Sequence, residues 1–121
     1  MTKKILIVDD EPNIVISLEF MMKREGFEVA TAADGDAALA QVAAFAPDLV
    51  LLDVMMPKKS GYEVCELLRA EPACAGLRIV MLTAKGRETE VAKGIALGAD
   101  AYVTKPFSTK DLVAQVKALL A

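Results

Sequence analysis

The stretch VLLDVMMPKKSG, residues 50–61, places one carboxylate, Asp53, directly after a short aliphatic run and before Pro57 and Gly61. A Val- and Leu-rich run without polar alternation is typical of a parallel strand that is buried on both faces. A charge at the end of such a strand either caps the following loop or serves a site at the edge of the sheet. Asp53 taken alone supports both interpretations equally.

The rest of the chain alternates short aliphatic runs with longer amphipathic segments, which predicts strands followed by helices. The predicted strands are Lys4 to Val8, Glu28 to Ala32, Leu49 to Leu52, Arg78 to Leu82 and Ala101 to Val103. The predicted helices run from near Pro12 to Gly26, from about Asp36 to Phe45, from Gly61 or Tyr62 to Ala70, and from Glu88 to Leu97, and a last one opens at Ser108. We therefore expect an α/β fold, a flavodoxin-like doubly wound (βα)5 three-layer sandwich with a parallel sheet of order 2-1-3-4-5.

Composition bounds the size and the class of the protein. The chain has 121 residues, of which 55% are hydrophobic and 26% charged, so residues 1–121 are expected to form one globular domain. The net charge is −3 and the basic residues are scattered, which argues against direct nucleic-acid binding by this segment. The last predicted helix runs to Ala121, so we expect a stand-alone domain or one excised from a longer protein.

The sequence disfavours a redox thiol site, a zinc site and a secreted or membrane location. Cys65 and Cys74 form no CxxC pair and the chain has no His, so both are expected to be plain thiols and not zinc ligands. No signal peptide or membrane-length apolar run is present, so we expect a cytoplasmic protein without membrane contact.

The candidate functional residues follow the predicted strands. In a sheet of this order the site lies beyond the carboxyl ends of the strands, where strands one and three meet. The polar residues at those ends are Asp9, Asp10, Glu11, Asp53, Thr83, Thr104 and Lys105. Crowded carboxylates repel one another unless a cation lies among them, and a ligand set made only of oxygen favours Mg²⁺ over zinc or copper.

Such a site is suited to phosphoryl transfer. The Asp53 carboxylate would attack phosphorus and become an acyl phosphate, with Mg²⁺ and Lys105 offsetting charge and Thr83 donating a hydrogen bond. Each residue also has an ordinary structural role open to it: Asp9 and Asp10 as helix caps, Thr83 as a strand-end residue and Lys105 as a solvated turn. The convergence of all of them on one edge favours the site.

Four motifs, KILIVDDEP, LVLLDVMMPKKSG, IVMLTAKG and GADAYVTKPF, together resemble the receiver domain of bacterial two-component response regulators, similar to the chemotaxis-regulator fold. The resemblance covers the whole chain. It implies that Asp53 is the phosphoacceptor and that Asp10, Asp53 and the backbone carbonyl of Met55 bind Mg²⁺, with Asp9 a ligand through water. It also implies that Thr83 and Lys105 contact the phosphoryl group and that Lys105 and Pro106 are joined by a cis peptide bond.

The resemblance further implies a switch. On phosphorylation Thr83 would move toward the phosphoryl group and Tyr102 would rotate inward, reshaping the face formed by helix four, strand five and helix five. Without the resemblance, Tyr102 is interpreted as a half-buried ring with its hydroxyl in water. Met55 and Lys85 flank the site and are expected to set the lifetime of the phosphoryl group.

The resemblance also implies partners. Since the chain has no His, a sensor histidine kinase or a histidine phosphotransfer protein would supply the phosphoryl group, and an effector protein or domain would respond to it. A phosphorylation-dependent homodimer through the switch face is a further implied partner. Val91, Ala101 and Gln115 stand where winged-helix regulators usually carry charge, which argues against a salt-bridged form of that dimer.

Three other functions share parts of this pattern. An aspartyl-phosphate phosphatase needs a second Asp two residues after its nucleophile, and Met55 stands there, so we expect slow autodephosphorylation and not a multiple-turnover enzyme. A flavodoxin needs a hydroxyl- and glycine-rich phosphate loop where this chain has Asp9, Asp10 and Glu11. A phosphorylation-independent adaptor is an alternative that the presence of all the required side chains disfavours.

Overall fold

Five parallel strands form a single sheet in the order β2-β1-β3-β4-β5, which confirms the predicted topology. The computed structural model describes residues 2–56, 58–84, 95–105 and 107–121. The strands are β1 (Lys4–Val8), β2 (Glu28–Ala32), β3 (Leu49–Asp53), β4 (Arg78–Ala84) and β5 (Ala101–Lys105).

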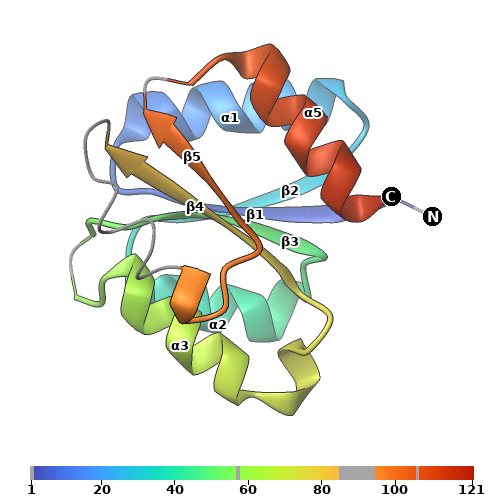
Figure 1. Cartoon of the computed structure of the whole chain (residues 1–121). Coiled ribbons are helices and arrows are strands. Elements are labelled where there is room, and N and C mark those ends of the chain that lie inside the picture. Colours follow the sequence, from blue (N-terminus) through green and yellow to red (C-terminus); the bar gives the residue numbers. More distant parts are fainter. Residues whose placement is uncertain (1, 57, 85–94, 106) are drawn as a thin grey trace.

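Helices cover both faces of the sheet and make three layers (Figure 1). One face carries α1 (Pro12–Arg24) and α5 (Thr109–Leu120), and the other carries α2 (Gly35–Phe45) and α3 (Gly61–Ala70), followed by the short 3₁₀ turn η1 (Pro72–Cys74). Of the fourth predicted helix, Glu88 to Leu97, residues 88–94 lie outside the described residues.

The aliphatic strands explain the layering, because successive side chains point to opposite faces. Leu6, Val50 and Leu52 are fully buried in the cluster that includes Val64 and Leu68 of α3. Ile5, Ile7 and Leu51 are fully buried in the second cluster, which includes residues of α1 and α5. Two cores therefore lie on either side of one sheet, as expected for strands without polar alternation.

Local signals set the helix ends. Pro12 occupies the first turn of α1, and Gly26, just beyond its end, has φ +92°, the left-handed conformation expected there. The Ser60 hydroxyl and the Glu63 carboxylate form a complete capping box at the start of α3. Ser108 likewise accepts a hydrogen bond from the backbone N–H of Asp111 at the start of α5.

Three strands run farther than their aliphatic runs predicted. The parallel ladder continues to Asp53 in β3, Ala84 in β4 and Lys105 in β5, one or two residues beyond each predicted end. Backbone groups make these ladder hydrogen bonds, so a polar side chain does not by itself end the strand. The predicted site residues Asp53, Thr83 and Lys105 are therefore held by the sheet and not by loops.

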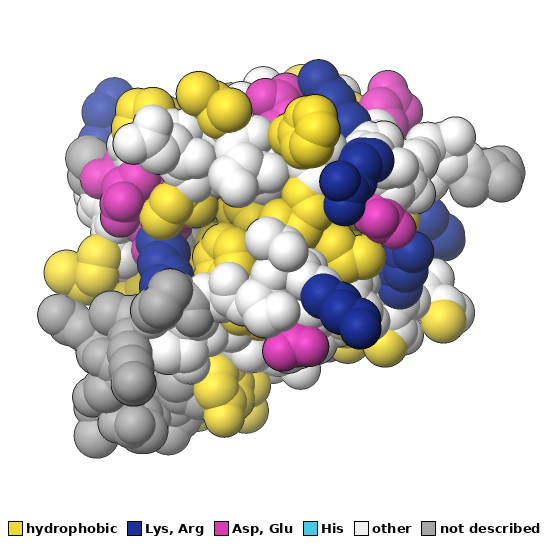
Figure 2. Space-filling view, turned by 90° about the horizontal axis from the view of Figure 1, so that it is seen from above, with side chains coloured by type: hydrophobic (Ala, Val, Ile, Leu, Met, Phe, Trp, Pro, Cys, Tyr) yellow, Lys and Arg dark blue, Asp and Glu magenta, His cyan; other side chains and the backbone are white. Residues whose placement is uncertain are grey.

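The face formed by α1 and α5 carries mixed charges. Figure 2 shows Lys and Arg side chains lying among Asp and Glu side chains on the described part of this face, with hydrophobic side chains between them. Among the described residues, the most exposed large apolar side chains are Ile16 and Phe20 of α1, at 64% and 66%. Within the described residues, no helix has both the length and the apolar character needed to cross a membrane.

Candidate functional site

Three carboxylates meet at the carboxyl edge of the sheet. Asp9 and Asp10 follow β1, Asp53 ends β3, and the ladder that pairs Val8 with Leu52 makes these strands neighbours. One oxygen from each of the three carboxylates lies within 4.8 Å of the others. Asp9 and Asp53 are buried, whereas Asp10 is exposed to solvent. The cluster thus opens to solvent on the Asp10 side.

Lys105 reaches this cluster from the far edge of the sheet. Its Nζ donates to Asp9 Oδ2 at 3.0 Å and to Asp53 Oδ1 at 3.2 Å, although β4 lies between β5 and β3. Glu11 Oε1 lies 3.9 Å from the same nitrogen. Asp9 is held a second time, because its Oδ1 accepts a hydrogen bond from the backbone N–H of Glu11 at 2.9 Å. One ammonium therefore bridges two buried carboxylates.

The protonation of Asp53 reflects this crowding. Burial is the largest cause that raises the pKa of Asp53, and the charge of Asp9 adds to it, while Lys105 opposes the rise; the result is a pKa of about 6. Burial works to lower the pKa of Lys105, but its contacts with Asp9 and Asp53 outweigh that effect and raise it. A single ammonium thus leaves the cluster short of positive charge.

The donor set fits a hard divalent cation. All available ligands are carboxylate oxygens, the kind that Mg²⁺ and Ca²⁺ prefer, and none of the three is Cys or His. Added positive charge among the three carboxylates would favour the ionised form of Asp53, whose pKa is raised. Asp10 is the solvent-facing member, and Asp9 already has both oxygens engaged by Lys105 and Glu11.

Thr83 adds a buried hydroxyl at the same edge of the sheet. It lies near the end of β4, the strand that pairs with both β3 and β5, and is 2% exposed. Within the described part of the chain, its Oγ1 has no hydrogen-bond partner. Since leaving a buried hydroxyl unpaired costs about 1–3 kcal/mol, this donor is available to an acceptor that enters the site.

The connection from β3 to α3 carries Met55, the residue predicted to supply a carbonyl ligand. Val54 N–H donates to the Leu82 carbonyl at 3.2 Å, and Gly61 N–H donates to the Val54 carbonyl at 2.8 Å. The side chain of Met55 is 61% exposed. The first end of the connection is therefore tied to β4 and the second end is tied to the first, while the Met55 side chain faces solvent.

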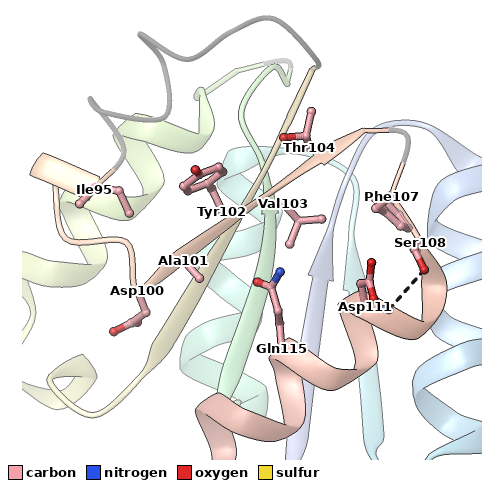
Figure 3. Close-up of a pocket in the computed structure, with 10 residues that line it drawn as sticks. All are labelled: Ile95, Asp100, Ala101, Tyr102, Val103, Thr104, Phe107, Ser108, Asp111 and Gln115. Atoms are coloured by element: carbon pink, nitrogen blue, oxygen red, sulfur yellow. Dashed lines mark hydrogen bonds between the residues drawn. The ribbon is translucent and has the colours of Figure 1, made fainter.

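Tyr102, the predicted switch residue, lies away from the carboxylates. It lines a groove of about 660 Å³ that Ala101, Val103 and Thr104 of β5 share with Asp111 and Gln115 of α5 (Figure 3). Figure 3 shows its ring on the side of β5 that faces Ile95, whereas Val103 points toward α5. The ring is 46% exposed, which is an outward position.

The structure thus brings most of the predicted residues together. Asp9, Asp10, Asp53 and Lys105 form one cluster, with Thr83 at the end of the strand between β3 and β5. Lys85 and Val91 lie outside the described residues, as does Pro106 with its predicted cis bond. The approach of Glu11 to Lys105 was not predicted, although its position directly after Asp9 and Asp10 indicates that it lies at the same edge of the sheet.

Comparisons with known proteins give consistent matches. A sequence model described as the response regulator receiver domain matches residues 5–117. The chain is 49% identical over 120 residues to the alkaline phosphatase synthesis transcriptional regulatory protein PhoP of Bacillus subtilis, covering 99% of this chain and 49% of that protein. It is 48% identical over 120 residues to the DNA-binding response regulator MtrA of Mycolicibacterium smegmatis, covering 99% and 51%.

Solved structures agree with these sequence matches. The chemotaxis response regulator CheY4 of Vibrio cholerae superposes with a TM-score of 0.92 at 31% identity, over 98% of this chain and 99% of that one. The chain spans about half the length of the curated relatives it matches.

Proposed function

This chain belongs to the response regulator receiver domain family, and on that premise we propose that Asp53 accepts a phosphoryl group from a phosphohistidine of another protein. The observation that carries the proposal is the cluster of Asp9, Asp10 and Asp53, with Lys105 bound to two of its members. We propose that residues 1–121 act as one phosphoacceptor domain.

The proposed reaction uses Asp53 as the nucleophile. An Asp53 carboxylate oxygen forms a bond to phosphorus while the phosphorus–nitrogen bond of the donor breaks, and the imidazole leaves with the electron pair. Lys105 Nζ, already 3.2 Å from Asp53 Oδ1, offsets the charge of the phosphoryl oxygens. The Thr83 hydroxyl, which has no partner in the part of the chain that the structure describes, donates a hydrogen bond to one of them.

We propose that Mg²⁺ is the cofactor, held by Asp10, Asp53 and the backbone carbonyl of Met55, with Asp9 bound through a water. Bound there, Mg²⁺ would supply charge neutralisation for the carboxylates and the phosphoryl oxygens. The exposure of Asp10 supports its role as a direct ligand. The engagement of both Asp9 oxygens by Lys105 and Glu11 supports an indirect role for Asp9.

Signalling would follow from two side chains. Thr83 moves toward the phosphoryl group, and the outward ring of Tyr102 turns into the space that Thr83 leaves, which alters the groove between β5 and α5. An effector protein or domain that binds this face in only one of its forms would read the change. A phosphorylation-dependent homodimer through the same face is part of the proposal.

The phosphorylated protein is proposed as a signal and not as a turnover intermediate. Met55 stands two residues after Asp53 and cannot transfer a proton, so hydrolysis of the acyl phosphate lacks a general acid at that position. Met55 and Lys85 would then set the lifetime of the phosphoryl group. The proposed donors are a sensor histidine kinase or a histidine phosphotransfer protein. A cytoplasmic location is proposed with them, which the unpaired thiols of Cys65 and Cys74 support.

The experiment is incubation with phosphoramidate, with Mg²⁺ or with EDTA, followed by intact-mass measurement. Wild type is expected to gain one phosphoryl group from phosphoramidate when Mg²⁺ is present and none in EDTA. Asp53→Asn is expected to gain none, and the exposed-carboxylate control Glu66→Gln is expected to behave as wild type. An unchanged wild-type mass would favour the adaptor function, and continuing phosphate release from a simple monoester would favour a phosphatase.

A further inference from the structure

Gly35, at the start of α2, lies against the connection from β3 to α3. It is buried, and a Cβ built on it would lie 2.4 Å from Lys59 Cβ and 2.7 Å from the Lys59 carbonyl oxygen. Real Cβ atoms essentially never approach other atoms this closely, and one of the two contacts is to backbone. The missing side chain at position 35 therefore allows Lys59 to occupy its present place.

Charge contributes little to this contact. Lys59 Nζ lies 3.4 Å from Asp36 Oδ1 and Lys58 Nζ lies 3.9 Å from Asp34 Oδ2, and at least one side chain in each pair is more than half exposed. Exposed ion pairs of this kind contribute about 0–1 kcal/mol. The close backbone contact at Gly35, and not the ion pairs, fixes how near the connection comes to α2.

The start of α2 and the far end of the connection are both held in place. The start of α2 is fixed by Asp34, whose Oδ1 accepts a hydrogen bond from the backbone N–H of Ala37 at 2.8 Å. The far end of the connection is fixed by Gly61, where a Cβ would lie 2.3 Å from the Asp53 carbonyl oxygen. A displacement at Lys59 therefore acts on Met55, which lies four residues earlier in the same connection.

We propose that Gly35 is a positioning residue for metal binding: its lack of a side chain seats Lys59 on α2 and thereby sets the position of the Met55 carbonyl. The proposal rests on the function proposed above, in which that carbonyl is a Mg²⁺ ligand. Gly35 touches neither carboxylate nor phosphoryl group and acts only through Lys59.

The test is Mg²⁺ affinity, measured by isothermal titration calorimetry on the unphosphorylated chain. Gly35→Ala is expected to weaken Mg²⁺ binding about tenfold, as changes to groups that orient metal ligands usually do. The matched control is Gly76→Ala, where a Cβ would meet nothing within 4 Å, and its affinity should equal that of wild type.

A second pair of variants keeps the test decisive if Gly35→Ala does not fold. Lys59→Ala and Lys59→Gly remove the same charge, but only Lys59→Gly removes the Cβ that packs on Gly35. Lys59→Gly is expected to weaken Mg²⁺ binding several-fold relative to Lys59→Ala. Phosphorylation by phosphoramidate should slow in Gly35→Ala at low Mg²⁺ and recover at saturating Mg²⁺, a split that a general loss of structure would not produce.

The outcomes separate the two proposals. Equal Mg²⁺ affinity in wild type and Gly35→Ala, or in the two Lys59 variants, overturns the role of Gly35 and leaves Asp53 as phosphoacceptor. A wild-type chain that binds no Mg²⁺ overturns the proposed metal site and the role of Gly35 with it.

Discussion

Replacing Asp53 by Asn should stabilise the metal-free protein, because the site holds an ionised carboxylate that burial disfavours. The pKa of Asp53 is raised from 3.8 to about 6 by burial and by Asp9. The folded state therefore binds the proton more tightly than the unfolded state, and stability falls as pH rises from about 4 through 6. Above that pH range, the ionised Asp53 lowers the free energy of unfolding by about 3 kcal/mol, at about 1.4 kcal/mol per pKa unit.

Asn carries no charge at any pH and escapes this loss. The free energy of unfolding of Asp53→Asn should exceed that of wild type by about 1 kcal/mol at pH 4.5 and about 3 kcal/mol at pH 7.5. Urea unfolding in EDTA at both pH values measures the difference, with Glu66→Gln as control, for which a change within about 0.5 kcal/mol is expected. A less stable Asp53→Asn at pH 7.5, or a gain equal at both pH values, would refute the reasoning.

Three further substitutions test the surroundings of Asp53. Lys105→Met should lower the free energy of unfolding by about 3–5 kcal/mol, since Asp9 and Asp53 lose their shared ammonium. Urea unfolding measures this change. Unchanged stability would contradict the role of Lys105 in neutralising the two carboxylates. Thr83→Val should raise stability by about 1–3 kcal/mol because it removes a buried hydroxyl that has no partner among the described residues. The variant should also slow phosphorylation in the mass assay. A destabilised variant would show that the hydroxyl is satisfied. Lys58→Gly should raise the midpoint of thermal unfolding, because glycine adopts the φ of 69° at this position without the strain of about 1 kcal/mol that a side chain causes. The matched comparison is Ala46→Gly, where φ is 52° and the midpoint should rise by a similar amount.

The strand order and the members of the site were predictable because both follow from topology. Once the sheet order is known, the carboxyl ends of β1 and β3 must be neighbours, so Asp9 and Asp53 come together although they are far apart in sequence. The strand ends were less predictable. The aliphatic pattern stops at Leu52, but the backbone ladder continues to Asp53, because hydrogen bonding along the strand does not depend on side-chain polarity.

Other features had weaker sequence signals. The capping box at Ser60 and Glu63 has a recognisable spacing, and so does the cap that Ser108 forms with Asp111, but neither spacing alone shows which hydrogen bonds form. The contact between Gly35 and Lys59 had no sequence signal at all. A glycine that begins a helix has many explanations, and only the packed structure shows which backbone it admits.

Of the three clustered carboxylates, Asp53 is the one proposed to carry the phosphoryl group. Borohydride reduces an acyl phosphate to an alcohol and so converts the phosphorylated Asp to homoserine. The chain is treated with phosphoramidate and Mg²⁺, reduced, digested and sequenced by mass spectrometry. Homoserine at position 53 alone is the predicted result. Homoserine at position 9 or 10, or a phosphoryl group on a Ser or Thr hydroxyl that survives hydroxylamine, would contradict the account.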